Sequence, residues 1–466
     1  MTTEVRPAGS ATEITEQLAP VFRGELIAPD NPAYEVHRRV WNFDIDRRPA
    51  LIARCAGVAD VIAAVKAARA SGITTAVRSG GHSFPGLSVC DDGFVIDLSL
   101  MKGMRVSPDR TTVRAQAGVL LGELDRETQA FATAVPAGIV TTTGLAGLTL
   151  GGGIGWLMRK YGLTADQLLS VDMVTADGDL VRASEDENAD LFWGIRGAGA
   201  NFGIVTEFEF RLNPLGPTVL AGPMAWPMED APKLLRFYRE WAAGLPDEMT
   251  TGVVLRKAPS LPVIPAEVHG RRVVMVVACH AGPVEDGQRL VQPLRDFAPP
   301  LVDLCAPKPF LAHQSMFDAG LPRGWSYYFR SCDVAGLSDD VIDVVVRHGM
   351  AIGSPTSAIV AFQLGGAMAR VPEDASAFNG RGSAFTFNIT GNSPDPAAFP
   401  PEREWVKKLW SDLEPHNSGA YVNFLMDEGE DRVRRSYGPE KFARLQALKR
   451  KYDPQNFFRL NQNIAP

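Results

Sequence analysis

Cysteine is scarce in this sequence, and no two cysteines lie at a metal-binding spacing. The chain of 466 residues has five cysteines, all isolated, and no CxxC pair. An odd, scattered set of this kind argues against a disulfide framework and against a zinc site. Seven histidines are present, and none forms an HxH or HExxH pattern. We therefore expect no metal and a reducing, cytoplasmic setting.

An excess of positive charge is also missing. Lysine and arginine number 47 against 54 acidic residues, which gives a net charge of −7. A chain with this balance has no global basic field that could hold nucleic acid or an anionic membrane. We expect neither as a partner, and we expect a monomer or a homodimer that acts on a small molecule.

Hydrophobic runs that could enter a membrane are lacking, with one apparent exception. The chain begins with the polar stretch MTTEVRPAGS, which has no apolar core typical of a secretory signal. Residues 135–158 are uncharged and long enough to span a bilayer, but the run is rich in glycine and threonine. Such a composition forms a poor helix and suits buried backbone in close approach to something else.

Regular elements can be predicted along the first half of the chain. Residues 58–72 carry the i, i+3, i+4, i+7 apolar stripe of a helix, and Gly72 is placed to end it. An Asp177-Gly178 pair inside residues 165–184 predicts a β-hairpin. We expect a further helix at 121–131 and strands at 73–79, 94–101, 111–118 and 201–214.

The pattern changes after about residue 214. β-rich runs at 271–282, 357–368 and 383–392 alternate with helical runs such as 338–353, which begins with a Ser-Asp cap. This pattern predicts an antiparallel sheet covered by helices. The last residues return to a strand around YVNF, a helix and a polar tail. We therefore expect domains at 1–214 and 215–418, followed by a C-terminal segment at 419–466.

The stretch VRSGGHSFPG, residues 77–86, places a histidine in a glycine loop. The loop matches neither GxGxxG nor GxxxxGK[ST], because its glycines are adjacent and no lysine follows. Adjacent glycines still allow backbone N–H groups to surround an anion. Arg78, Ser79 and Ser83 add donors suited to a phosphate. A plain glycine-rich turn with a surface histidine is the alternative.

A second glycine cluster occupies residues 144–157, GLAGLTLGGGIGWL. Two uncharged glycine loops in one domain suggest a ligand long enough to contact both, and a dinucleotide has that length. A set of tight turns in a glycine-rich sheet would give the same pattern.

Five blocks in order carry a family resemblance: WNFDIDRRPALIARC, VRSGGHSFPG, GLTLGGGIGWLMRKYGLTADQLL, DLFWGIRGAGANFGIVTEFEF and the C-terminal region from YVNFLMDEG to NQNIAP. They span nearly the whole chain, which resembles the bacterial type of berberine-bridge-enzyme-like oxidases in the vanillyl-alcohol oxidase superfamily. The resemblance implies an α+β fold. It also implies a PCMH-type FAD-binding domain built from both chain ends, and a separate substrate domain.

The resemblance implies how FAD is held. His82 would bond through a ring nitrogen to the flavin, and residues 78–81 with Ser83 would hold the pyrophosphate. Val140 stands where many relatives have a second, cysteine tether, so a single covalent link is expected. Other positions that the resemblance places near FAD are Gly144, Gly147, Leu148, Gly151, Gly152, Gly155, Val205, Asn461 and Asn463.

Two positions differ from the commoner family pattern. Thr143 occupies the oxygen-access position, where valine is usual in oxidases, so access looks open and a hydroxyl is added. Phe424 occupies the position of the usual catalytic tyrosine and cannot take a proton. Tyr421, on the same face of a regular strand as Asn423, is one remaining candidate for catalysis, with Gln363 and Asn388 as others.

The resemblance thus predicts a covalent-FAD enzyme that takes hydride from a C–H next to oxygen or nitrogen and passes the electrons to O₂. Loss of the usual base favours an acidic substrate, such as an enolic or phenolic polyketide, with oxidase or oxygenase outcome. An amine oxidase or a sugar oxidase releasing peroxide is the alternative. A sugar site could use aromatic residues such as Trp241, Trp325, Tyr327 and Tyr328. A non-catalytic flavin-holding protein is the alternative from another class.

Overall fold

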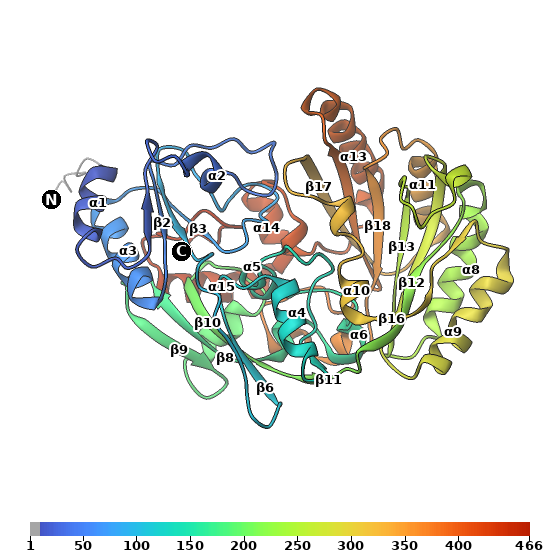
Figure 1. Ribbon diagram of the computed structural model, residues 1–466, viewed down its shortest axis with the longest axis horizontal. Coiled ribbons are helices and arrows are strands. Elements are labelled where there is room, and N and C mark those ends of the chain that lie inside the picture. Colours follow the sequence, from blue (N-terminus) through green and yellow to red (C-terminus); the bar gives the residue numbers. More distant parts are fainter. Residues whose placement is uncertain (1–9) are drawn as a thin grey trace.

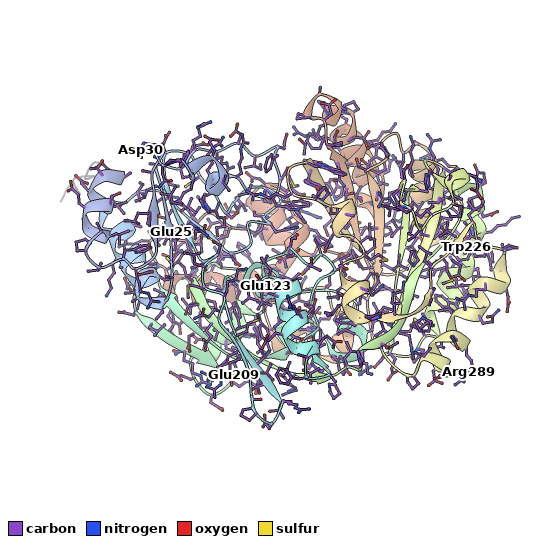
Figure 2. All side chains as sticks on the ribbon, in the orientation of Figure 1. Glu25, Asp30, Glu123, Glu209, Trp226 and Arg289 are labelled. Carbon is purple, nitrogen blue, oxygen red and sulfur yellow. The ribbon has the colours of Figure 1, made fainter. Side chains whose placement is uncertain are left out.

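The computed structural model describes residues 10–466, so the polar start of the chain up to residue 9 lies outside it. Figure 1 shows two lobes, one formed by the first half of the chain with the C-terminal helices, the other by the middle of the chain. The interior is apolar, as Trp226 illustrates, whereas Asp30 and Arg289 lie at the surface (Figure 2). The predicted α+β class is confirmed.

The first sheet of the N-terminal lobe consists of short strands, two of which are joined by a helical crossover. Strands β2 and β3 both pair in parallel with β4, and helix α3 connects β2 to β3. The predicted helix is confirmed as α3, which ends where Gly72 adopts φ +69°. The elements are α1 (Ala11–Leu18), β1 (Glu25–Ile27), α2 (Tyr34–Arg38), β2 (Leu51–Arg54), α3 (Val58–Ser71), β3 (Thr75–Arg78) and β4 (Phe94–Asp97), in sheet order β1-β2-β4-β3.

The second sheet of this lobe is antiparallel, in the order β5-β6-β10-β8-β9. The predicted hairpin is confirmed between β8 and β9, with Gly178 at φ +78° in its turn. Its strands are β5 (Met104–Val106), β6 (Thr112–Gln116), β8 (Leu168–Thr175), β9 (Leu180–Ser184) and β10 (Gly203–Arg211). Around it lie α4 (Leu121–Gln129), α5 (Leu145–Leu150), α6 (Met158–Tyr161), α7 (Ala189–Ile195) and the short pair β7 (Thr133–Ala134) and β11 (Asn213–Pro214).

The C-terminal segment returns to this lobe. Helices α14 (Glu430–Tyr437) and α15 (Pro439–Tyr452) place Phe442 and Leu445 in the same buried cluster as Phe202 and Phe208. The buried Lys449 ammonium donates to the carbonyls of residues 201 and 458 and to the Asp453 carboxylate. Residues from both chain ends therefore share one core, as the resemblance implied.

The middle of the chain forms one large antiparallel sheet, in the order β15-β12-β14-β13-β18-β19-β17, with β16 beside β12. Its strands are β12 (Thr218–Pro227), β13 (Met249–Lys257), β14 (Arg272–His280), β15 (Val302–Asp303), β16 (Ala306–Pro309), β17 (Ser326–Val334), β18 (Ala358–Gln363) and β19 (Phe385–Ser393). The helices of this lobe are α8 (Ala231–Ala243), α9 (Val284–Phe297), α10 (Phe310–Gln314), α11 (Asp339–Met350), α12 (Ala367–Arg370) and α13 (Phe399–Leu413).

The two faces of this sheet differ, as alternation along a strand requires. Leu255, Ile359 and Ile389 belong to the core that the sheet shares with the covering helices. Their neighbours Val254, Val360 and Asn388 align across β13, β18 and β19, and they point to the opposite face. That face turns toward the N-terminal lobe and forms one wall of a cavity.

Two expectations differ from the structure. The strand expected at YVNF is a 3₁₀ turn, η8 (Val422–Phe424), because the chain crosses from the sheet to the glycine loops there. The run 357–368 ends in the short helix α12. The uncharged run 135–158 is mostly loop, as its composition predicted, with the short helix α5 inside it. None of the helices within residues 10–466 could cross a membrane. The other 3₁₀ turns are η1 (Thr164–Gln167), η2 (Met228–Asp230), η3 (Ala266–Val268), η4 (Asp318–Gly320), η5 (Glu373–Ala375), η6 (Pro396–Ala398) and η7 (Glu414–His416).

Candidate active site

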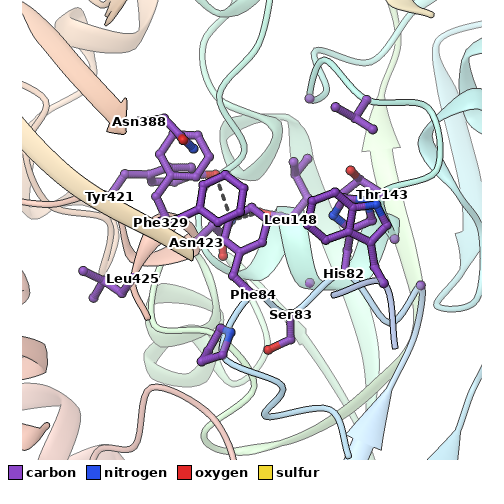
Figure 3. Close-up of a pocket in the computed structure, with 18 of the residues that line it drawn as sticks. His82, Ser83, Phe84, Thr143, Leu148, Phe329, Asn388, Tyr421, Asn423 and Leu425 are labelled. Atoms are coloured by element: carbon purple, nitrogen blue, oxygen red, sulfur yellow. Dashed lines mark hydrogen bonds between the residues drawn. The ribbon is translucent and has the colours of Figure 1, made fainter. Parts of the chain in front are cut away.

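A cavity of about 360 Å³ lies between the glycine loops and the free face of the large sheet. His82, Thr143 and Leu148 line it from the N-terminal lobe, while Phe329 and Asn388 line it from strands β17 and β19. Figure 3 shows these side chains around one space, with Tyr421 and Asn423 contributed by the C-terminal segment. Three separate parts of the chain therefore build the site.

The two glycine loops touch each other. A Cβ added to Gly80 would lie 2.5 Å from the backbone nitrogen of Gly144, and one added to Gly144 would lie equally close to that of Gly80. Any side chain at either position would push the loops apart. This contact explains why adjacent glycines stand after β3 and why a second glycine cluster is needed.

The first loop presents its backbone amides. Within residues 10–466, the N–H groups of residues 80–83 donate to no carbonyl or side chain. The side chains beside them are already engaged, since the Ser79 hydroxyl donates to the Ala117 carbonyl at 2.6 Å and that of Ser83 accepts from the Leu87 amide. A run of free amides of this kind can surround an anion such as a pyrophosphate.

Arg78 has another role than the one expected of its side chain. Its guanidinium forms an ion pair with Asp97 at 2.5 Å and also donates to the His37 carbonyl. It does not line the cavity. Arg78 therefore fixes the end of β3 and the start of the loop, and the loop's backbone is left to face the cavity.

His82 is a neutral ring held by stacking. It lies on Trp41 with ring centroids 4.3 Å apart, and Trp41 in turn stacks on Tyr327 at 3.7 Å. Its Nε2 is 3.4 Å from the Thr142 hydroxyl. Desolvation inside the protein lowers the pKa of His82 to about 3, so the ring is neutral near pH 7 and one nitrogen keeps a lone pair.

The glycines of the second cluster fall into two groups. A Cβ added to Gly147 would meet no atom within 4 Å, so the backbone there borders open cavity. A Cβ on Gly152 would instead meet the Phe378 ring, and one on Gly151 or Gly155 would collide with Asn423 or with the Ala137 carbonyl. Gly151, Gly152 and Gly155 do not line the cavity. They allow the C-terminal turn and neighbouring segments to pack closely.

The loop of residues 138–143 is held by the middle of the chain. The Asp318 carboxylate accepts from the Thr141 amide at 2.9 Å and from its hydroxyl at 2.5 Å. The Gln314 amide group donates to the Gly138 carbonyl at 3.1 Å. Val140 and Thr143 consequently face the cavity from a loop that two contacts fix to the other lobe.

Tyr421 lies at the centre of a small polar group. Its hydroxyl oxygen accepts from the Gly153 amide at 2.9 Å and from the Asn423 side chain at 2.8 Å. Within residues 10–466 the Tyr421 hydroxyl donates to no acceptor. Burial raises the pKa of Tyr421 to about 12 although both bonds lower it, so the phenol keeps its proton at neutral pH.

The expected site residues are brought together only in part. Asn388 lines the cavity and its amide oxygen has no partner within residues 10–466, and Asn461 also lines it. Gln363 lies outside it, bonded to Thr251 and to the Ala242 carbonyl. Val205 pairs with β8 in the core, and Asn463 does not reach the lining.

Several lining residues were not singled out from the sequence. Phe84 and Phe329 stack with centroids 3.9 Å apart, and Phe362 and Arg256 line the same cavity. Period-2 alternation in the strands could have indicated the last two, had the buried face been known. The aromatic residues considered for a sugar site, Trp241, Trp325, Tyr327 and Tyr328, do not line it.

The residues present fit FAD. The free amides of residues 80–83, the open space beside Gly147 and the neutral His82 suit a dinucleotide with a pyrophosphate and a ring end. Together with the α+β lobe and the opposing antiparallel sheet, they define the class of two-domain flavin-dependent oxidoreductases.

Comparisons with known proteins agree with this class. The family described as "FAD binding domain" matches residues 49–184, and "Berberine and berberine like" matches residues 420–465. An FAD-linked oxidoreductase of Dictyostelium discoideum is 31% identical over 462 residues, covering 98% of both chains. The (R)-6-hydroxynicotine oxidase of Paenarthrobacter nicotinovorans is 31% identical over 461 residues, covering 96% of this chain and 97% of that enzyme.

Solved structures show the same arrangement. The 6-hydroxy-D-nicotine oxidase of Arthrobacter nicotinovorans superposes with a TM-score of 0.85 at 28% identity, covering 96% of this chain and 98% of that one. Xylooligosaccharide oxidase from Myceliophthora thermophila gives 0.84 at 25% identity, covering 97% and 99%. The chain belongs to the berberine-bridge-enzyme-like family of FAD-linked oxidoreductases.

Proposed function

We propose that this protein is a covalent flavoenzyme in which His82 forms the single link to FAD. The observation that carries the proposal is the neutral His82 ring at the cavity wall, next to four free backbone amides. Only an uncharged imidazole has a nitrogen lone pair with which to form such a bond. Val140 supports a single link, because an aliphatic side chain faces the cavity where a second tether would stand.

We further propose that the enzyme oxidises a small organic substrate and uses O₂ as the electron acceptor. When bound, FAD supplies the acceptor for a hydride from a C–H bond beside oxygen or nitrogen and returns the electron pair to O₂. Thr143 lines the cavity, and its hydroxyl donates to no group within residues 10–466. An oxidase or an oxygenase outcome is open to such a site.

Tyr421 acts as a hydrogen-bond donor to the substrate. Its oxygen already receives two hydrogen bonds, so its own proton is the free donor in the cavity. With a pKa raised to about 12, it does not act as a base at neutral pH. Asn388, with an amide oxygen that lacks a partner, offers an acceptor from the opposite wall.

The lining supports an aromatic or polycyclic substrate of natural-product tailoring over a sugar. Phe84, Phe329 and Phe362 make the cavity largely apolar, whereas oligosaccharide hydroxyls need many polar partners. An amine resembling the substrates named for the nicotine oxidases is the second candidate, favoured by the same apolar walls.

We propose residues 1–214 and 419–466 as the FAD-binding domain and residues 215–418 as the substrate domain. The shared core of Phe202 and Phe442 supports the first assignment. We also propose a cytoplasmic location, because all five cysteines are buried and unpaired.

Acid precipitation of the purified protein tests the covalent link. We expect the pellet to stay yellow, and we expect His82→Ala to release its flavin into the supernatant. His416→Ala is the matched control, since His416 lies away from the cavity, and it should keep the flavin in the pellet. A colourless pellet from the unaltered protein would rule out the link. Oxygen uptake and peroxide release on a panel of aromatic alcohols, enols and amines test turnover.

A further inference from the structure

Arg256 is the only residue with a permanent charge among those that line the cavity within residues 10–466. No aspartate, glutamate or lysine lines it, and His82 is neutral. Every other contribution is apolar or an uncharged polar group. The cavity therefore carries a net positive charge before any ligand enters.

The sheet register fixes where this charge lies. Arg256 is near the end of β13, opposite Ala358 of β18, which is itself opposite Thr390 of β19. All three positions face the cavity rather than the helices. Gly320 lies beside the guanidinium, because a Cβ there would be 3.8 Å from Nη1. The absence of a side chain at Gly320 leaves the charge accessible from the cavity.

The guanidinium has no acidic partner. Nε donates to the Lys257 carbonyl at 3.1 Å and Nη2 to the Pro355 carbonyl at 3.4 Å, and no carboxylate within residues 10–466 forms an ion pair with it. Desolvation lowers the pKa of Arg256. A half-buried cation without a counter-ion has lost part of its hydration, and an anionic ligand that enters the cavity offsets that cost.

The rest of the cavity is suited to a flat apolar body. Phe84 and Phe329 stack at 3.9 Å with planes 13° apart, and Phe362 and Phe424 lie with centroids 6.0 Å apart. These rings come from both lobes and the C-terminal segment. The free amides that suit a pyrophosphate belong to the loop after β3, in the other lobe from Arg256.

We propose that the substrate is a planar, largely apolar organic anion, and that its carboxylate or ionised enol oxygen pairs with Arg256. The inference rests on the proposed function and names the substrate class of that same site. It agrees with the absence of a base at Phe424, since an ionised enol needs no proton removed before hydride leaves. Arg256 thereby determines specificity by charge, and the phenylalanine rings determine it by shape.

Isothermal titration calorimetry on the holoenzyme tests this proposal without turnover. The probes are 2-naphthoate, the neutral 2-naphthamide of nearly the same shape, and the acidic enol 2-hydroxy-1,4-naphthoquinone. We expect both anions to bind at least about tenfold more tightly than the amide, as a desolvated charge pair allows. The visible spectrum of the flavin should shift on binding, which places the probe in the same cavity.

Three variants test whether Arg256 causes the preference for anionic probes. Arg256→Gln should weaken both anions about 10- to 100-fold and leave the amide unchanged. Arg256→Lys should keep an intermediate preference, and it keeps the test decisive if Arg256→Gln does not fold. Arg271→Gln removes an equal charge from an exposed position before β14 and should change nothing. An anion preference for one class alone would identify carboxylate or enol as the group that Arg256 binds.

Three outcomes would overturn the proposal. They are equal affinity of the unaltered protein for anion and amide, an equal loss for both probes in Arg256→Gln, and loss of FAD from that variant. In the last case Arg256 holds the cofactor. The proposed function fails separately, if the flavin is not linked or if no oxygen is taken up. Calorimetry measures the anion preference independently of both results.

Discussion

The two lobes contribute to the cavity by different means. The glycine loops of the N-terminal lobe offer backbone amides and space, while the large sheet offers side chains such as Arg256 and Asn388. Backbone groups are the same in every chain that keeps the glycines, so this half suits a cofactor that does not vary. Side chains on alternate strand positions can change without altering the sheet, so that half suits a substrate that does vary.

Gly144→Ala should produce the largest effect in the half of the cavity that the glycine loops form, which we call the cofactor half. The added Cβ would lie 2.5 Å from the Gly80 nitrogen, and backbone on both sides cannot give way cheaply. We expect a loss of about 2–4 kcal/mol in the free energy of unfolding and poor flavin incorporation. Urea denaturation and the flavin-to-protein absorbance ratio measure the two quantities.

Gly147→Ala is the matched control for that prediction. Its Cβ would meet no atom within 4 Å and it lies inside α5, where alanine is the better helix former by about 1 kcal/mol. We expect unaltered or higher stability but reduced FAD content, because the methyl group enters cofactor space. Equal destabilisation by both substitutions would contradict the distinction between contact glycines and space-leaving glycines.

Tyr421→Phe should produce the largest effect on catalysis among residues of the C-terminal turn. It removes the only free hydroxyl donor of that group and leaves the Gly153 amide without an acceptor, while the Asn423 side chain keeps only its bond to the Leu148 carbonyl. We expect kcat to fall about 100-fold with the flavin still linked, and a stability loss of about 1–3 kcal/mol. Stopped-flow flavin reduction separates the chemical step from oxygen reaction.

The pH dependence of stability gives a second test of Tyr421. Because burial raises its pKa in the folded state from 10.0 to about 12, the protonated phenol favours folding below pH 10. That contribution decreases as the pH rises from 10 toward 12. The stability difference between the unaltered protein and Tyr421→Phe should therefore be constant below pH 10 and shrink above it. A constant difference up to pH 12 would show that the phenol is not buried.

Asp318→Asn tests the contact between the lobes and should have a smaller effect. The carboxylate holds both the amide and the hydroxyl of Thr141, and an amide side chain accepts through one oxygen only. We expect about 1–2 kcal/mol of destabilisation and faster iodide quenching of flavin fluorescence. Thr141→Val removes only the hydrogen bond from the hydroxyl. It should therefore cause less destabilisation and a smaller increase in quenching than Asp318→Asn. If quenching is unaltered in both, the loop does not depend on this contact.

The sequence predicted local elements well, because these depend on residues close along the chain. The helix that Gly72 ends and the hairpin at Gly178 are examples. It could not predict that Gly152 packs against Phe378, or that Gln363 is bonded away from the cavity, because these contacts join distant segments. The role of Arg256 follows from strand register, which is fixed only when β13, β18 and β19 are assembled.

Thr143→Val should have the smallest effect, and it tests whether the cofactor half influences the outcome with O₂. The Thr143 side chain faces the cavity without a hydrogen bond from residues 10–466, and valine has nearly the same volume. We expect a stability change within about 0.5 kcal/mol and a change of less than about threefold in the rate of flavin reoxidation. Thr143→Leu places one methylene group more than Thr143→Val at the same position, and it should slow reoxidation more than it slows reduction by substrate. If ¹⁸O from O₂ enters the product with threonine but not with valine, the hydroxyl favours the oxygenase outcome. If the unaltered protein and Thr143→Val label the product equally, the substrate decides between the oxidase and the oxygenase outcome. The half of the cavity formed by the large sheet would then control that choice.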